Sequence, residues 1–362
     1  MNKDATHKSA LHEVNGIKQP KKVSKNSINR IKIHRKKTAS AKEFIAEIQK
    51  GNITYLSQAI TLIESTNPKH KKKASEIIKG CLPYANNSIR IGITGVPGVG
   101  KSTFIESFGK LLTGKRKKVA VLAIDPSSSV NKGSILGDKT RMEALVKDKN
   151  AFIRPSPSGD SLGGVARKTR ETIILCEAAG FDTIFIETVG VGQSETAVHS
   201  MVDFFLLLKL AGAGDELQGI KRGIIEMADA IVINKADNEN EKAAKLAKVA
   251  FNRALHLYPI KESEWQPKVT TCSAFYNIGM DSVWEIIQDY LKLVIKNGYF
   301  EKNRAKQNEF WLYETINQNL KDRFYHNPII KKELENELPK ISKSEQTPFE
   351  LAEKLVQLYF KS

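Results

Sequence analysis

The sequence predicts an α/β fold, in which a mostly parallel β-sheet is flanked by helices and followed and preceded by helical extensions. From Ser88 onward, short apolar runs alternate with amphipathic segments, as strands alternate with helices in such folds. The runs are continuously apolar, which is typical of parallel strands buried on both faces. The expected strands span 89–94, 118–124, 151–154, 182–187, 203–208, 229–233 and 268–272, and the main helices span 101–113, 163–179, 239–256 and 278–296.

Helical periodicity continues outside the predicted sheet. Before it, Asn52 or Thr54 is a candidate N-cap, and Asn67-Pro68 is expected to end the second helix. After it, the stripe that includes Leu351 and Leu355 needs a surface on which to pack. This favours dimerisation through these helices, with packing on the chain's own domain as the alternative. The predicted organisation is a disordered basic tail over 1–38, an N-terminal helical extension over 39–87, a nucleotide-binding domain over 88–298 and a C-terminal helical dimerisation extension over 299–362.

Much of the positive charge of the chain lies near its start. The formal net charge is +17 over 362 residues, and clusters of lysine and arginine precede residue 38. We expect this tail to be solvated, with docking on an acidic partner as an alternative. It contains no aromatic side chains between the basic ones, which argues against nucleic acid as a partner.

Composition favours a protein of the cytoplasm. No apolar run has the length needed to span a membrane, and the start has no apolar signal core. Cys81, Cys176 and Cys272 lie far apart without metal-like spacing, so we expect reduced packing residues. The histidines form no ligand pair at helical spacing either, which argues against a structural zinc or nickel site.

Residues 95–102 carry the complete motif of a phosphate-binding loop. They stand between a predicted strand and a predicted helix, so glycines let the backbone approach a phosphate and the helix start supplies N–H groups. Lys101 is expected to reach the β- and γ-phosphates, and Ser102 to hold Mg²⁺. The motif therefore predicts a P-loop NTPase fold. The expected nucleotide contacts here are Gly95, Val96, Pro97, Gly98, Val99, Gly100, Lys101, Ser102 and Thr103.

Two acidic residues stand where predicted strands end, at the edge of the sheet that should hold the phosphates. Asp125 follows the second strand, and Glu187 ends the fourth, with Gly190 three residues later. This spacing is typical of GTPases, in which the carboxylate acts on the Mg²⁺ shell and the glycine N–H meets the γ-phosphate. Gln193 is a candidate for orienting the attacking water, although its spacing is unusual.

The residues that follow another predicted strand indicate which nucleotide base is bound. Asn234, Lys235 and Asp237 follow an apolar run, and a carboxylate there can accept hydrogen bonds from both N1–H and the amino group of guanine. Adenine offers neither group at these positions. The Lys235 stem can lie over the base, and Ser273-Ala274 fits a backbone contact to guanine O6. We therefore predict GTP as substrate and GDP as product.

These motifs resemble those of the MeaB/ArgK/MMAA GTPases, in the group named for a Glu in place of the usual Asp. The resemblance runs from about residue 55 to 330 and is most specific over 91–237. It implies a GTPase that chaperones an adenosylcobalamin-dependent acyl-CoA mutase, chiefly methylmalonyl-CoA mutase. In that role GTP hydrolysis times cofactor loading and protects the mutase. The resemblance is carried by the phosphate loop, Asp125-Pro126-Ser127-Ser128, 133–142, 187–195 and 234–237.

Site residues follow from the same resemblance. It implies that Lys101, Ser102, Asp125, Asp138 and Glu187 build the phosphate and Mg²⁺ site, with Ser102 and the three acids as metal ligands and Lys101 and the acids as catalytic residues. It also implies an additional switch in the glycine-rich segment 210–221, although an ordinary strand-to-helix connection is an alternative. The expected switch contacts to the mutase are Asp215, Glu216, Gln218 and Lys221.

Other functions stay open at this point. A nickel- or cobalt-delivery GTPase has the same architecture but needs a Cys/His cluster that the sequence does not show. An older label for such sequences is a kinase linked to arginine or ornithine transport. An NTPase that binds nucleic acid through the basic tail is a third class. The sequence does not identify which acyl-CoA mutase would be the client.

Overall fold

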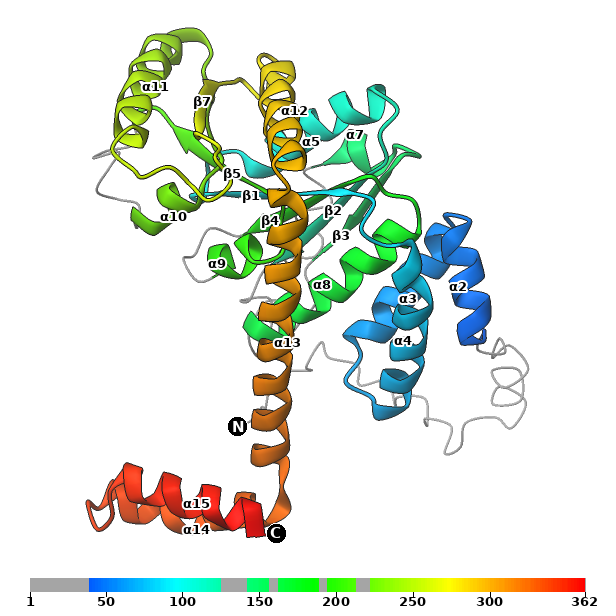
Figure 1. Cartoon of the computed structure of the whole chain (residues 1–362), viewed down its shortest axis with the longest axis vertical. Coiled ribbons are helices and arrows are strands. Elements are labelled where there is room, and N and C mark those ends of the chain that lie inside the picture. Colours follow the sequence, from blue (N-terminus) through cyan, green and yellow to red (C-terminus); the bar gives the residue numbers. More distant parts are fainter. Residues whose placement is uncertain (1–38, 125–141, 156–161, 189–193, 213–221, 362) are drawn as a thin grey trace, which may run out of the picture. The chain divides into compact units, whose positions relative to one another are not determined.

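The computed structural model describes residues 39–124, 142–155, 162–188, 194–212 and 222–361 (Figure 1). Its contacts divide the chain into Met1–Ser40 and Ala41–Ser362, and the description below concerns the second unit. Within the described residues, no helix is both long enough and apolar enough to cross a membrane. The cysteines at 81, 176 and 272 are buried and unpaired, as expected for packing residues.

A parallel seven-stranded sheet forms the centre of this unit, as the alternating sequence pattern predicted. The strand order is β3-β2-β4-β1-β5-β6-β7, and every neighbouring pair is parallel. The carboxyl ends of these strands therefore lie along one edge. The strands are β1 (Ile89–Gly95), β2 (Val119–Ile124), β3 (Ala151–Arg154), β4 (Thr183–Thr188), β5 (Phe204–Leu210), β6 (Ala230–Asn234) and β7 (Lys268–Thr271).

Helices cover both faces of the sheet (Figure 1). On one face, Phe108 and Trp284 from two of these helices pack against Ile91 and Phe185 of the sheet. On the other face, Phe251 packs in a cluster with Leu207 of β5 and Ile231 of β6. The first face carries α5 (Lys101–Gly114), α7 (Glu143–Val146) and α12 (Met280–Lys296), and the second carries α8 (Leu162–Ala178), α9 (Ser194–His199), α10 (Arg222–Met227) and α11 (Glu241–Leu255).

Three helices precede the sheet and pack on α8: α2 (Ala41–Gln49), α3 (Ile53–Glu64) and α4 (Pro68–Cys81). Asn52 is the N-cap of α3, since its Oδ1 accepts from the N–H groups of Thr54 and Tyr55. The prediction that Asn67-Pro68 ends the second helix was wrong, because α3 already ends at Glu64. Asn67 instead caps α4, and Pro68 suits the first turn, where no helical acceptor exists for its missing N–H.

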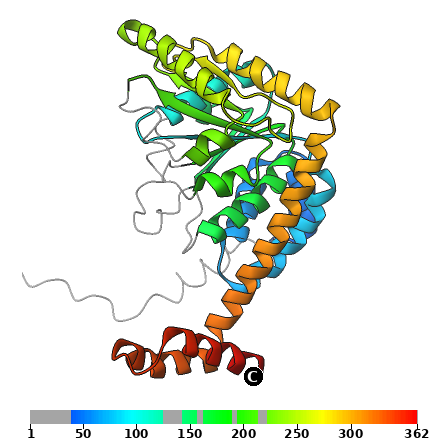
Figure 2. The ribbon, with the colours of Figure 1, turned by 60° about the vertical axis from the view of Figure 1, so that its left-hand side comes forward.

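Three helices follow the sheet: α13 (Tyr299–His326), α14 (Pro328–Ser342) and α15 (Pro348–Lys361). Figure 2 shows α13 continuing from α12 to the pair formed by α14 and α15. Leu351 and Leu355 of the predicted stripe are buried against Ile330 of α14. The stripe thus finds part of its packing surface within the chain itself.

A buried ion pair attaches α13 to the end of the sheet at which the strands begin. Arg304 Nε and Nη2 donate to the two carboxylate oxygens of Asp203, each at 2.8 Å. The same guanidinium donates to the carbonyl oxygens of Asn86 at 2.9 Å and Ser88 at 2.6 Å. Burial by itself lowers the pKa of Arg304, but hydrogen bonds with Asp203 and its charge raise it overall. The guanidinium thus donates four hydrogen bonds, two to a carboxylate and two to backbone carbonyl oxygens.

Candidate nucleotide-binding site

The phosphate loop connects the end of β1 to the start of α5, as the motif predicted. A Cβ on Gly95 would lie 2.7 Å from the Leu208 carbonyl oxygen, so only glycine lets β1 and β5 approach this closely. Gly100 has φ +91 and precedes the helix without a side-chain cap. The first N–H groups of α5 therefore point out of the helix with no side chain of residue 100 to satisfy them, which is the arrangement that binds phosphate.

Lys101 lies in the first turn of α5 and reaches back over the loop. Its Nζ donates to the carbonyl oxygens of Gly95 at 2.8 Å and Val96 at 3.3 Å. Burial lowers the pKa of Lys101, while the charges of Glu187 and Glu195 oppose this shift. The ammonium group thus lies against the carbonyl oxygens of the loop and feels the charges of two carboxylates.

Oxygen donors meet at the same edge of the sheet. Glu187 lies near the end of β4, only 9% exposed, and pairs in register with Ile93 of β1. Ser102 is the second residue of the neighbouring helix α5. The described residues contain no group of three or more His, Cys, Asp or Glu side chains that could hold a metal. Mg²⁺ does not require such a group, because one or two side-chain oxygens together with phosphates and water suffice, so these donors fit Mg²⁺.

The predicted base contacts converge on the phosphate loop from β6 and the segment after β7. Asn234 Nδ2 donates to the Val99 carbonyl oxygen at 2.9 Å, and its Oδ1 accepts from the Ala274 N–H at 3.1 Å. Lys235 Nζ donates to the Gly98 carbonyl oxygen at 3.0 Å. One amide side chain therefore joins three segments that are far apart in the sequence.

A cavity of about 290 Å³ opens beside these residues. The Ser273 hydroxyl donates to an Asp237 carboxylate oxygen, which holds the acid at the rim. Phe275 and Tyr276, which the sequence reasoning missed, also line the cavity with 76% and 52% of their surfaces exposed. Their position directly after the predicted base contacts Ser273-Ala274 could have indicated that they lie at the base site. The cavity has the polar acceptor and aromatic surface that a purine base requires.

Comparison with known proteins agrees with this geometry. The model of the family described as "Methylmalonyl Co-A mutase-associated GTPase MeaB" matches residues 56–329. The chain therefore belongs to the MeaB family. It is a GTPase, as the phosphate-loop and guanine motifs predicted, and the predicted fold class is confirmed as well.

Relatives of this MeaB-family protein have several names. GTPase ArgK of Escherichia coli strain K12 is 46% identical over 289 residues, which cover 80% of this chain and 87% of the relative. The mitochondrial methylmalonic aciduria type A homolog of Mus musculus is 43% identical over 295 residues, which cover 79% and 71%. A solved structure of a LAO/AO transport system kinase has a TM-score of 0.71 at 36% identity, covering 90% of this chain and 99% of that one.

Several predicted site residues of the MeaB-family chain lie outside the described residues. They are Asp125, Asp138, Gly190 and Gln193 of the phosphate and Mg²⁺ site, and Asp215, Glu216, Gln218 and Lys221 of the expected additional switch. Their roles stay predictions.

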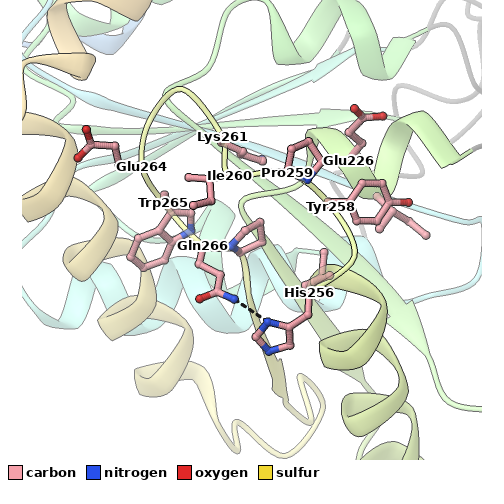
Figure 3. A pocket seen from close by; sticks show the side chains of 12 residues that line it. Glu226, His256, Tyr258, Pro259, Ile260, Lys261, Glu264, Trp265 and Gln266 are labelled. Atoms are coloured by element: carbon pink, nitrogen blue, oxygen red, sulfur yellow. Dashed lines mark hydrogen bonds between the residues drawn. The ribbon is translucent and has the colours of Figure 1, made fainter.

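A larger cavity of about 420 Å³ lies elsewhere, between α10, the end of α11 and the segment that leads to β7 (Figure 3). His256 and Gln266 are hydrogen-bonded across it at 2.9 Å. Lys261 Nζ is held by the carbonyl oxygens of Met227 and Ala228 and by Asp229, so its charge is already compensated. No residue of the phosphate loop lines this cavity, and its lining residues carry no phosphate-binding motif.

Proposed function

We propose that this GTPase is a chaperone of an adenosylcobalamin-dependent acyl-CoA mutase, most simply methylmalonyl-CoA mutase, and that it gates cofactor loading and protects the mutase. The observation that carries the proposal is the family match over 56–329, whose description names association with that mutase. The relative named for methylmalonic aciduria supports the same assignment. We place this function in the cytoplasm, where the unpaired cysteines would stay reduced.

For GTP binding, we propose that residues 95–103 and Gly190 surround the phosphates and that Asn234, Lys235, Asp237, Ser273 and Ala274 form the base site. Lys101 would neutralise charge on the β- and γ-phosphates. Ser102 and Glu187, with Asp125 and Asp138, would hold Mg²⁺, which when bound stabilises negative charge on the phosphate oxygens. Asp237 would select guanine by accepting hydrogen bonds from the N1–H and the amino group of the base.

The nucleotide site is tested with Lys101→Ala. Loss of the partly buried ammonium group beside the phosphates should weaken GTP binding at least about tenfold and reduce turnover further, because its charge is needed most in the transition state. Lys110→Ala is a matched control, since this lysine lies on the same helix but pairs with Asp148. Unchanged binding and turnover in Lys101→Ala would contradict the proposed site.

The chaperone role requires coupling between the nucleotide and the mutase. If GTP and GDP produce different mutase affinities, the mutase must change the nucleotide affinities by the same factor. We therefore propose measuring GTP hydrolysis with and without purified methylmalonyl-CoA mutase, and mutase binding in both nucleotide states. We expect slow intrinsic turnover that the mutase stimulates. No stimulation together with equal binding would contradict the role.

The name of the matched structure, a transport system kinase, supplies the second candidate function. A kinase transfers the γ-phosphate to a protein acceptor, whereas a GTPase releases it to water. Following label from the γ-phosphate of GTP therefore separates the two: release as free phosphate supports the GTPase chaperone. Label retained on an acceptor protein would instead support the kinase.

We also propose that the C-terminal helices 299–362 form a homodimer. On α13, Tyr313 and Leu320 are 58% and 54% exposed, and on α15 Phe349 and Phe360 are 84% and 81% exposed. Large apolar side chains at this density favour an interface. Light scattering on the variant Phe349→Ser/Phe360→Ser should report a monomer, with wild-type protein as the dimeric reference. A monomeric wild-type protein would contradict the proposal.

A further inference from the structure

Two neighbouring side chains at the start of α9 are buried without complete hydrogen bonding. Five buried side-chain polar atoms of the described residues have no hydrogen-bond partner, and two of these atoms are adjacent in sequence: Ser194 Oγ and Glu195 Oε2. Ser194 is 0% exposed and Glu195 is 2% exposed. Burying a carboxylate without satisfying both oxygens is costly, and such groups concentrate where a protein binds or reacts.

The position of α9 is set by close packing on the strand that leads into the phosphate loop. A Cβ on Gly92 of β1 would lie 3.0 Å from Val198 of α9, so the absence of a side chain lets the helix contact the strand directly. The helix also packs on β4, the strand that carries Glu187. The helix is thus supported by the two strands whose ends provide the proposed phosphate and Mg²⁺ residues.

Electrostatics agree with this placement. The Glu195 carboxylate is near enough to Lys101 to favour the protonated ammonium, even though it lies 94 positions later in the chain. A carboxylate that served only to neutralise Lys101 would be expected to accept hydrogen bonds from its Nζ. Lys101 instead donates to the Gly95 and Val96 carbonyl oxygens, and Glu195 Oε2 keeps its acceptor capacity.

We infer that Glu195 is a catalytic residue of GTP hydrolysis, whose Oε2, with Ser194 Oγ beside it, holds the attacking water in line with the γ-phosphate. The water oxygen bonds to the γ-phosphorus, and the bond from that phosphorus to the β–γ bridging oxygen breaks. GDP leaves with the electron pair. The proton of the water passes to the carboxylate and then to the released phosphate. This inference rests on the nucleotide site proposed above.

Glu195→Gln tests the inference, because the amide is nearly isosteric but is a far weaker proton acceptor. Single-turnover hydrolysis should slow by about 10²- to 10⁴-fold, the usual contribution of a general base. The dissociation constant for GTP, from calorimetry, should change by less than about threefold, since water and not the nucleotide is contacted. The melting temperature should stay equal or rise, because an unsatisfied buried charge is removed.

Glu337→Gln is the matched control, because it removes another buried carboxylate, 7% exposed, from the C-terminal helices. It should leave hydrolysis unchanged. Ser194→Ala is the second variant, and it should slow hydrolysis about tenfold with GTP binding retained.

The inference is overturned if Glu195→Gln hydrolyses GTP within about threefold of wild type, binds GTP much more weakly, or melts well below wild type. The first result denies a catalytic role, the second assigns Glu195 to nucleotide binding, and the third assigns it to the fold. Lys101→Ala distinguishes this failure from failure of the nucleotide site. If that variant binds GTP normally, the proposed site itself is wrong.

Discussion

Replacing Arg304 by Met should destabilise the protein strongly, although the residue lies far from the phosphate loop in sequence. The change removes a guanidinium that bonds both oxygens of Asp203 and two backbone carbonyl oxygens. Methionine retains most of the apolar stem of the side chain, so lost packing is a small part of the effect. What is left behind is a carboxylate, 4% exposed, without its cationic partner.

The magnitude follows from this uncompensated charge. Breaking a buried ion pair by removing one partner costs about 3–5 kcal/mol. The unfolding entropy of about 2.1 cal/mol/K per residue over the roughly 320 residues of Ala41–Ser362 is about 0.7 kcal/mol/K. The melting temperature should therefore fall by about 4–7 °C. Adding Asp203→Asn neutralises the orphaned acid and should recover part of this loss.

Calorimetric melting of wild type, Arg304→Met and the double variant measures the effect at pH 7. Arg323→Met is the control, because this arginine is exposed near the end of the same helix. It should shift the melting temperature by less than about 1 °C, as most surface substitutions do. If the melting temperature of Arg304→Met falls by less than about 1 °C, or if the double variant recovers none of the loss, the reasoning that a buried ion pair stabilises the packing of α13 is refuted.

Three further outcomes follow from the structure. Gly92→Ala should cost about 1–3 kcal/mol by overpacking, since the new Cβ would lie 2.8 Å from a Phe205 ring carbon, and a melting temperature equal to wild type would contradict this. Asp237→Asn should weaken GTP about a hundredfold or more and improve binding of xanthosine triphosphate, which carries a carbonyl in place of the amino group; competition binding measures both, and unchanged GTP affinity would exclude Asp237 from the base site. Hydrogen bonds, of which the one with Lys110 has the largest effect, lower the pKa of Asp148 to about 2, below its usual value of 3.8. The ionised carboxylate therefore contributes its full stabilisation of the folded protein above about pH 4 and loses it as the pH falls through 2. Asp148→Asn should therefore melt below wild type at pH 7 and converge with it toward pH 2, and a difference that is constant with pH would argue against this pairing.

The sequence by itself determined the elements and their chemistry. All seven strands lie within about two residues of their expected bounds, because continuous apolar runs between glycine-, proline- and asparagine-rich breaks leave few alternatives. The phosphate loop could also be predicted from the sequence, because phosphate binding requires its glycines, Lys101 and Ser102 at a fixed local spacing. The N-cap at Asn52 was anticipated for the same reason, whereas Asn67-Pro68 was misread because a turn signal can end one helix or begin the next.

Only the tertiary structure decided which distant residues meet. The order that places β1 between β4 and β5 brings Glu187 beside the phosphate loop, and Asn234 reaches Val99 across 135 positions of sequence. The buried state of Glu195 and the pairing of Arg304 with Asp203 are likewise products of packing between elements. Local patterns record the conformation of a segment and which face it buries. They do not indicate which neighbour covers that face, because the choice of neighbour depends on the free energy of the whole assembled sheet.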